Sequence, residues 1–248
     1  MNSFLCWIGE KKQLRKEIIK RFPAQKSKKY VEVFGGAGWV LFGKEVIPKQ
    51  LEVLNDCNSE LITLYRCAKY HPEELQKECQ YLINSREIFS DFKQQLNTKG
   101  LTDIQRSARF LYILKISYGA DLSSYGRYSK SLHTSIDMLP KVSERLKKVV
   151  IENMNYDNLI LSYDSEDTLF YLDPPYFGSE KYYSSQFTKE DHIKLAKLLR
   201  QIKGKFILSY NDDPFIRDLY SDFHIEEIAR TNNLNHRSFY ELIIRNYT

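Results

Sequence analysis

The sequence predicts an α/β protein with a parallel, doubly wound sheet that is interrupted by a block of helices. The first observation is the opening of the chain, where a strand at residues 29–34 and a glycine-rich loop lead through a short helix to a second strand and helix. The second is the return of strand and helix alternation after residue 149. The third is a run of helical patterns over residues 72–116. Alternating strands and helices are typical of parallel sheets covered on both faces.

The individual elements follow from apolar spacing and from helix breakers. Pro23 ends a basic amphipathic helix, and the Ser-, Gly- and Tyr-rich residues 117–133 favour a loop or hairpin. In chain order, the expected helices lie at residues 10–22, from 39, at 58–69, within 72–116, near 140–148, at 188–201 and at 213–221. The expected strands lie at residues 29–34, 51–54, 149–152, 168–172, 206–210, 223–229 and 239–245.

The composition is that of a globular protein. The 248 residues are 42% hydrophobic and 28% charged, which allows a sizeable core and argues against disorder. No run approaches 18 apolar residues, and the first residues lack an apolar stretch with a small-residue cleavage site. We therefore expect no membrane span, no secretory signal and a cytoplasmic location. The four cysteines form no C-x-x-C pair, so neither a zinc site nor a redox pair is expected.

The charge is unevenly distributed along the chain. Residues 1–30 contain nine Lys or Arg and two Glu, and residues 101–150 contain nine Lys or Arg and four acidic residues, although the whole chain carries only +5. Two basic segments on an otherwise acidic chain indicate a surface for a polyanion such as nucleic acid. Solvated helix faces explain the same charges, so charge alone does not decide.

The first candidate for chemistry is the loop Phe34-Gly35-Gly36-Ala37-Gly38, which follows an apolar strand. Glycines let the backbone turn sharply and approach a ligand closely. Asp56 closes the next strand, where an acid commonly holds the hydroxyls of a ribose. The pattern predicts a nucleoside cofactor, with a tight turn and a helix-capping aspartate as the alternative. The phosphate-binding G-x-x-x-x-G-K-[ST] pattern is absent from the sequence.

The second candidate is Asp173-Pro174-Pro175-Tyr176, directly after the apolar residues 169–172. Two prolines stiffen the turn and remove two N–H donors, which leaves a rim of acceptors beside an aromatic ring. Such a rim fits a planar ring with an amino group, which would stack on Tyr176 and donate to Asp173 and to the Pro174 carbonyl. A flipped nucleobase is a ring of that kind. A simple strand terminator is the alternative.

The chain resembles the Dam-type, or D12-class, DNA adenine N6-methyltransferases from Phe4 to Tyr247. Phe4 to Lys11 is similar to the family pattern F-L-x-W-x-G-G-K, and Tyr30 to Gly38 is similar to Y-V-E-P-F-x-G-x-G. The other matching segments are the acidic strand end at 54–58, Asp-Pro-Pro-Tyr at 173–176, the next strand at 206–212 and the closing segment at 230–247.

The resemblance implies a Rossmann-like methyltransferase sheet with a mostly helical inserted target-recognition domain. Residues 1–69 and 146–248 would form the catalytic domain that binds S-adenosylmethionine, and residues 70–145 the DNA-binding insert. The implied activity is methyl transfer from S-adenosylmethionine to N6 of a flipped-out adenine at a specific site in double-stranded DNA. A cognate restriction endonuclease acting on the same site is a candidate partner. Neither a metal nor a membrane is expected to take part.

The matching positions imply roles for individual residues. The catalytic residues would be Asp173, Pro174 and Tyr176. The cofactor would be held by Trp7, Lys11, Phe34, Gly35, Gly36, Ala37, Gly38, Asp56, Cys57 and Asp173. The candidates for DNA contact are basic and aromatic residues of the insert, namely Arg106, Arg109, Lys115, Tyr118, Tyr125, Arg127, Tyr128 and Lys130. Arg127 is preferred because arginine is the commonest reader of guanine, with phosphate contact or solvation as the alternative for each one.

Two positions depart from the family pattern and keep alternatives open. Glu10 stands where the family has a second glycine, and Val33 stands where it has proline. Glu10 leaves room for a catalytically weak DNA-binding relative, which would bind little S-adenosylmethionine. Cytosine N4-methylation and RNA or protein amino-methylation use similar motifs and stay as alternatives. Cytosine C5-methylation is excluded, because it needs a Pro-Cys nucleophile and no cysteine here follows a proline.

Overall fold

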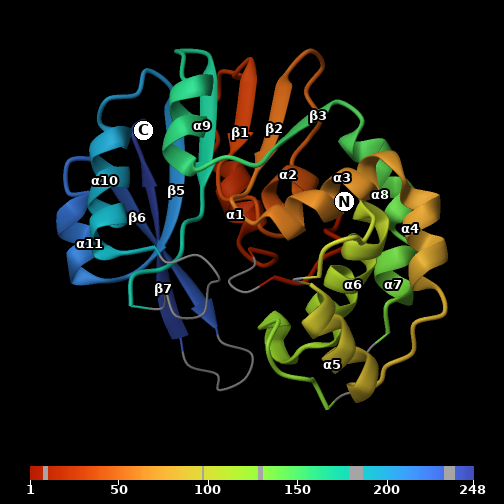
Figure 1. Cartoon of the computed structure of the whole chain (residues 1–248). Coiled ribbons are helices and arrows are strands. Elements are labelled where there is room, and N and C mark those ends of the chain that lie inside the picture. Colours follow the sequence, from red (N-terminus) through yellow and green to blue (C-terminus); the bar gives the residue numbers. More distant parts are fainter. Residues whose placement is uncertain (8–10, 97, 128–130, 179–186, 232–237) are drawn as a thin grey trace.

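The computed structural model describes residues 1–7, 11–96, 98–127, 131–178, 187–231 and 238–248, which form a seven-stranded sheet with helices on both faces (Figure 1). The strands are β1 (Lys29–Glu32), β2 (Leu51–Asn55), β3 (Val149–Glu152), β4 (Thr168–Leu172), β5 (Lys205–Asn211), β6 (His224–Thr231) and β7 (Ser238–Arg245). Their spatial order is β3-β2-β1-β4-β5-β7-β6. All seven strands expected from the sequence are confirmed, with bounds that differ by at most two residues.

The sheet is parallel over five strands and antiparallel at one end. β1 pairs in parallel with β2 and β4, β2 with β3, and β4 with β5. β7 runs antiparallel to both β5 and β6 and lies between them. The expectation of a parallel sheet is therefore wrong for the last two strands. Apolar periodicity identifies a strand but carries no information on its direction or its neighbour.

The helices of the described residues agree with the expected pattern, with three corrections. They are α1 (Arg15–Lys20), α2 (Trp39–Gly43), α3 (Ser59–Tyr70), α4 (Pro72–Cys79), α5 (Arg86–Gln95), α6 (Asp103–Ile116), α7 (His133–Ile136), α8 (Leu139–Leu146), α9 (Tyr156–Tyr163), α10 (Lys189–Leu199) and α11 (Pro214–Leu219). The helix expected over 10–22 covers only Arg15–Lys20, and neither α7 nor α9 was expected. A short 3-10 turn at Tyr118–Ala120 lies in the segment expected to be a loop.

Side chains alternate across the sheet and define two hydrophobic cores. In β4, Leu169 and Tyr171 face the core covered by α1, α2, α3, α6 and α8, whereas Phe170 and Leu172 face the core covered by α9, α10 and α11. Figure 1 shows these two helical layers on either side of the strands. Burial on both faces explains why the parallel strands read as continuous apolar runs.

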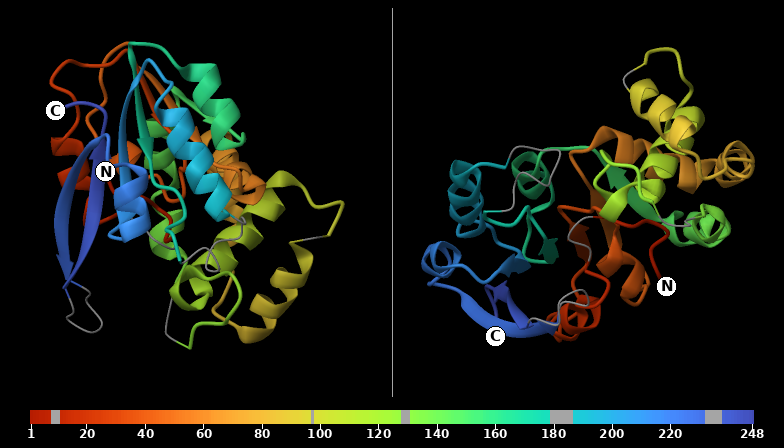
Figure 2. Two further views of the ribbon diagram at one scale, coloured as in Figure 1. Left: turned by 90° about the vertical axis from the view of Figure 1, so that its left-hand side faces the viewer. Right: turned by 90° about the horizontal axis from the view of Figure 1, so that it is seen from below.

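The helical block between β2 and β3 continues the first core. Phe110 and Leu111 of α6 belong to the same buried cluster as Tyr30 and Leu54 of the sheet. α6 packs against α3, and α4 and α5 pack against α6. Figure 2 shows the α4 and α5 end of this block projecting from the sheet. The block therefore extends one core and does not enclose a separate one.

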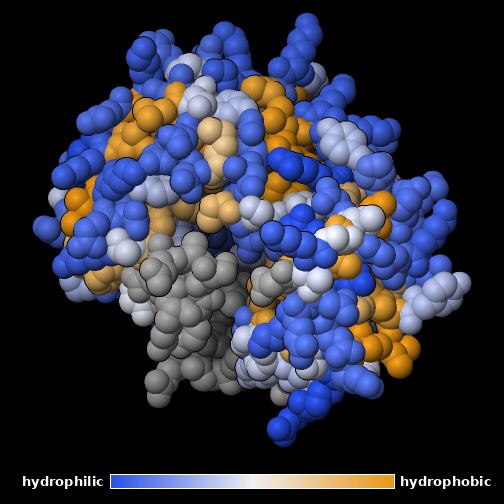
Figure 3. All heavy atoms as spheres, viewed as in Figure 1, coloured by the Kyte–Doolittle hydropathy of each residue, from blue (hydrophilic) through white to orange (hydrophobic). Residues whose placement is uncertain are grey.

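Hydrophilic side chains predominate on the face seen in Figure 3, where hydrophobic side chains form several separate groups. Among the described residues, no helix has the length and apolar character needed to cross a bilayer.

Candidate active site

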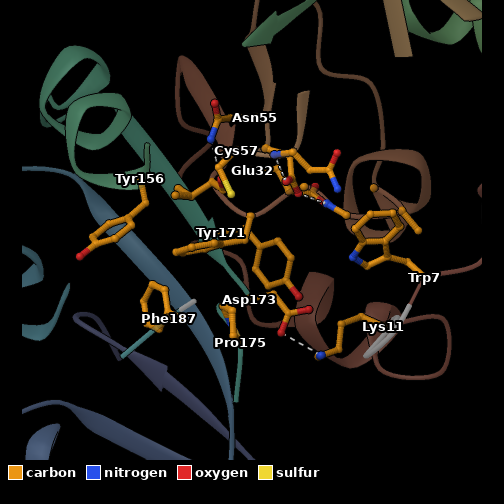
Figure 4. A pocket seen from close by; sticks show the side chains of 18 of the residues that line it. Trp7, Lys11, Glu32, Asn55, Cys57, Tyr156, Tyr171, Asp173, Pro175 and Phe187 are labelled. Carbon is orange, nitrogen blue, oxygen red and sulfur yellow. Dashed lines mark hydrogen bonds and ion pairs between the residues drawn. The ribbon is translucent and has the colours of Figure 1, made fainter. Parts of the chain in front are cut away.

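A cavity of about 920 Å³ lies at the carboxyl ends of β1 to β4 (Figure 4). Phe34 follows β1, Asp56 follows β2, Met154 follows β3 and Asp173 follows β4, and all four line the cavity. The chain passes from β1 outward to β2 and β3, then returns to place β4 on the other side of β1. Such a switch point is where open α/β sheets bind ligands.

The structure brings together the residues that the sequence assigned to a cofactor. The cavity is lined by Trp7, Lys11, Phe34, Gly35, Gly36, Ala37, Gly38, Asp56, Cys57 and Asp173. These residues come from segments separated by up to 166 positions. Their common location is the geometry that a nucleoside cofactor site requires.

The glycine-rich loop has the backbone that its sequence predicts. Gly36 and Gly38 have φ values of 47° and 65°, a left-handed region that favours glycine. A Cβ atom on Gly36 would lie 2.9 Å from Cδ1 of Trp7. The Tyr65 hydroxyl donates to the Gly36 carbonyl at 2.8 Å. The loop is thus held in place, and Trp7 packs directly on it.

Asp56 is fixed by backbone donors from Gly36, Cys57 and Asn58. The amide of Gly36 donates to its Oδ2 at 2.9 Å, and the amide of Asn58 donates to its Oδ1 at 2.9 Å. Burial raises the pKa of Asp56 above its ordinary value, although these backbone hydrogen bonds oppose the rise. The carboxylate of Asp56 is thus an oriented acceptor group at the cavity.

Asp173 lies on the other side of the cavity and is contacted by Lys11 and Ser209. Lys11 Nζ lies 2.8 Å from its Oδ1, and the Ser209 hydroxyl donates to the same atom at 2.9 Å (Figure 4 for Lys11). Burial raises the pKa of Asp173, and the charge of Lys11 opposes this effect. The result is an oriented acceptor at the end of β4.

The rest of the Asp-Pro-Pro-Tyr motif surrounds this acceptor. Pro175 lines the cavity and Pro174 is buried, while neither Pro174 nor Tyr176 is among the lining residues. The Tyr176 hydroxyl donates to Glu241 Oε2 at 2.9 Å. Lys11 Nζ lies 4.7 Å from the centre of the Tyr176 ring, so Lys11 contacts both ends of the motif.

An aromatic wall faces these polar groups, and the sequence reasoning missed most of it. The ring centres of Phe34, Tyr156 and Phe187 lie 5.6 to 5.9 Å apart. Figure 4 shows Tyr156 and Phe187 across the cavity from Trp7 and Lys11. Tyr156 begins α9 directly beyond the carboxyl end of β3. The rule that ligands bind at such ends was the signal available for finding it.

Glu32 at the end of β1 also lines the cavity and was not singled out from the sequence. Its Oε2 accepts from the Tyr30 hydroxyl at 2.7 Å and from the Leu41 amide at 2.8 Å. Burial raises the pKa of Glu32 to about 8, against the effect of these hydrogen bonds. A neutral carboxyl group is therefore available at the cavity near neutral pH.

The candidates for DNA contact fall into two groups. Arg106 pairs with Glu60 and Asp103, and Arg109 donates to the side chain of Gln95 and lies over the Phe92 ring, so both bind other parts of the chain.

In the following loop, Tyr118 and Arg127 are exposed. Lys115 is half-buried, and the Tyr125 hydroxyl donates to Asn84. Tyr128 and Lys130 lie outside the described residues, as does Glu10. The same loop reaches the cavity, where residues 120–123 form part of the lining.

Among the described residues, no group of three or more His, Cys, Asp or Glu side chains is arranged to hold a metal ion.

Comparison with known proteins gives a consistent result. The family model of D12 class N6 adenine-specific DNA methyltransferases matches residues 7–234. The type II methyltransferase M1.LlaDCHI of Lactococcus lactis subsp. cremoris is 31% identical over an alignment that covers 100% of this chain and 96% of the relative. The type II methyltransferase M.MjaIII of Methanocaldococcus jannaschii is 28% identical, with 100% and 99% covered. The DNA adenine methylase of Escherichia coli (strain K12) is 25% identical, with 94% and 90% covered.

Proposed function

The chain belongs to the D12 class of N6 adenine-specific DNA methyltransferases, and we propose that its cavity binds S-adenosylmethionine beside a flipped-out adenine of duplex DNA. The observation that supports this proposal is the placement of Asp56 and Asp173 on one cavity at the switch point of the sheet. Membership of the family favours adenine over the alternatives of cytosine N4, RNA and protein methylation.

The residues present fit an S-adenosylmethionine molecule. Asp56 offers fixed acceptors for ribose hydroxyls, and Phe34, Tyr156 and Phe187 offer an aromatic surface for a purine ring. Trp7 and the glycine-rich loop would hold the methionine end, and the Lys11 ammonium group would lie near the methionine carboxylate. When bound, S-adenosylmethionine supplies an electrophilic methyl group on a sulfonium.

Asp173 and Pro174 are proposed to activate the target amine. The carboxylate and the Pro174 carbonyl would accept the two N6 hydrogens, which localises on nitrogen a lone pair otherwise conjugated into the ring. Tyr176 would hold the base by stacking. Positioning and electrostatic stabilisation then account for most of the rate gain, without a covalent enzyme intermediate. The raised pKa of Asp173 also suits it to take the proton that the methylated amine loses.

Residues 70–145 are proposed to form the target-recognition region, and residues 1–69 and 146–248 the catalytic domain. The exposed positions Tyr118 and Arg127 support DNA contact, because they flank the loop that lines the cavity. Arg106 and Arg109 are better explained as part of the scaffold, since their guanidinium groups bind protein partners. Two relatives are named type II methyltransferases, which supports a partner endonuclease acting on the same site.

The proposal is tested by expressing the chain in cells and reading DNA modification by long-read sequencing. We expect N6-methyladenine in one sequence context with the wild type, and at least a roughly thousandfold loss of methylation with Asp173→Ala or Tyr176→Ala. Asp167→Ala is the matched control, because this exposed aspartate lies between α9 and β4 and its side chain pairs with Lys28 at the surface.

Normal methylation by Asp173→Ala would refute the assigned role. Calorimetric titration with S-adenosylmethionine tests the alternative of a catalytically weak relative, which predicts little or no binding.

A further inference from the structure

A buried carboxyl group that the mechanism above does not use lies next to the catalytic motif. Glu241 is 1% exposed and sits on β7, whose register places it opposite Asn211 at the carboxyl end of β5. This is the edge of the sheet at which the cavity lies. β7 is the antiparallel strand between β5 and β6, so a segment near the end of the chain reaches the site.

Glu241 contacts the motif through the hydroxyl of Tyr176. This hydroxyl donates to Glu241 Oε2 at 2.9 Å. The ring is further bounded by Tyr210, whose ring centre lies 6.0 Å away, and by Lys11 Nζ, 4.7 Å from the centre of the Tyr176 ring. The two prolines before Tyr176 fix its backbone approach. The hydrogen bond to Glu241 therefore fixes the far end of a ring whose near end is already restricted.

The residue type at position 241 is informative because the next three residues of β7 are apolar. Leu242, Ile243 and Ile244 follow it in β7 and are all fully buried. A buried carboxylate destabilises a fold unless hydrogen bonds or an ion pair compensate for its lost hydration. An apolar side chain would serve packing better at such a position. The hydrogen bond from Tyr176 is one such compensating contact, and it also orients the tyrosine ring.

We propose that Glu241 is a positioning residue that holds the Tyr176 ring, through its hydroxyl, in the orientation that stacks on the target adenine. This inference rests on the proposed function, since it assigns a partner to the stacking residue. Glu241 itself would contact neither the base nor the cofactor. Its removal should lower the rate of methyl transfer and leave cofactor affinity unchanged.

The test is a double-mutant cycle on the full chain with a duplex that contains the methylated sequence. Tyr176→Phe removes the hydroxyl and keeps the ring, Glu241→Leu removes the acceptor, and Glu241→Gln keeps an amide oxygen that accepts the same hydrogen bond. Because hydrogen bonds to charged groups are strong, we expect Tyr176→Phe and Glu241→Leu each to lower kcat about tenfold. The double variant should be within about twofold of either single variant, because the two changes remove one interaction.

The accompanying measurements separate positioning from general damage. The KM for S-adenosylmethionine should stay within about twofold in every variant, and Glu241→Gln should retain kcat within about threefold of the wild type. Glu227→Leu is the matched control, since this exposed glutamate of β6 pairs with Arg217 at the surface. It should leave kcat unchanged. Thermal unfolding of each variant reports whether the fold is intact.

Several outcomes would overturn the inference. These are an unchanged kcat in Tyr176→Phe, a Glu241→Gln variant as impaired as Glu241→Leu, and losses that multiply in the double variant. If Glu241→Leu does not fold, the comparison of Tyr176→Phe with Glu241→Gln still tests the positioning role of Glu241. Asp173→Ala is measured in the same assay. Turnover by that variant would refute the proposed function itself, whereas an inactive Asp173→Ala with an unimpaired Tyr176→Phe would refute only the role of Glu241.

Discussion

Three carboxyl groups that line the cavity, those of Glu32, Asp56 and Asp173, have pKa values raised by burial. Each accepts hydrogen bonds that favour its charged form. Burial and hydrogen bonding therefore shift the pKa of each group in opposite directions. Stability is reduced wherever such a group is ionised in the folded state against its burial. The fold therefore accommodates these buried carboxyl groups at a cost in stability.

The Glu32 carboxyl group gives a testable pH dependence of stability. Its pKa is about 8 in the folded protein and near 4.5 when unfolded, so between these values the folded state binds more protons. The free energy of unfolding should thus fall as pH rises from about 4.5 to 8, by at most about 1.4 kcal/mol per pH unit from this group. Glu32→Gln should flatten this slope and stabilise the protein at pH 8, as measured by urea unfolding across that range.

The exposed neighbour Glu45→Gln is the control and should keep the wild-type slope. An unchanged slope in Glu32→Gln would show that the group does not titrate in this window.

The positions of residues at the cavity were predictable where a motif fixes them, whereas contacts with a distant partner were not. Asp56 and Asp173 each follow an apolar strand, and the switch-point rule places such residues together. The ion pair of Arg106 with Glu60 was not predictable, because Glu60 lies 46 positions earlier on another helix. Glu241 is 65 positions from Tyr176, and nothing in the spacing connects them.

At the scale of elements, the glycine-rich loop after β1 gives the sharpest prediction. Gly36→Ala places a methyl group 2.9 Å from Trp7 Cδ1 at a φ of 47°, so it strains the backbone and displaces Trp7 from the cavity. We expect a loss of stability of about 1 kcal/mol or more and about tenfold weaker binding of S-adenosylmethionine, measured by calorimetry.

Gly100→Ala provides a matched control for backbone strain. Gly100 has a φ of 94° and no atom within 4 Å of the added methyl group, so its substitution should lower stability without affecting cofactor binding. Equal loss of affinity in both variants would contradict a specific role for the contact between Gly36 and Trp7.

Most elements could be predicted because their apolar spacing and caps are strong. The helix at Asp103–Ile116 begins with a capping box formed by Thr102 and Gln105, and α3 is capped by Asn58. The helix at Tyr156–Tyr163 was missed because it is short, has only two fully buried residues and starts at Asn155 without a side-chain cap. That omission also removed Tyr156 from the expected cavity.

At the scale of the whole molecule, two arginines of the helical block allow the proposed DNA contact to be separated experimentally from a structural role. Arg127 is exposed on the loop near the cavity, whereas Arg106 pairs with Glu60 of α3. Arg127→Ala should weaken DNA binding about tenfold and leave the melting temperature unchanged. Arg106→Ala should lower stability by about 1 kcal/mol or less and leave DNA affinity unchanged.

Fluorescence anisotropy of a labelled duplex and thermal unfolding are the two measurements. Weaker DNA binding by Arg106→Ala, with unchanged DNA binding by Arg127→Ala, would place the DNA surface on α6 and not on the loop.

The helical block and the sheet share one hydrophobic core, with Phe110 and Leu111 of α6 buried in the cluster that contains Tyr30 and Leu54. A helical block taken from a distant homologue would fit this sheet only if its buried side chains matched the shared core. On the proposal that the outer loop contacts DNA, sequence preference changes more easily through substitutions in that loop than through exchange of the entire segment. Related enzymes with different sequence preferences should therefore differ at a few outward-facing positions and share the buried residues of the block.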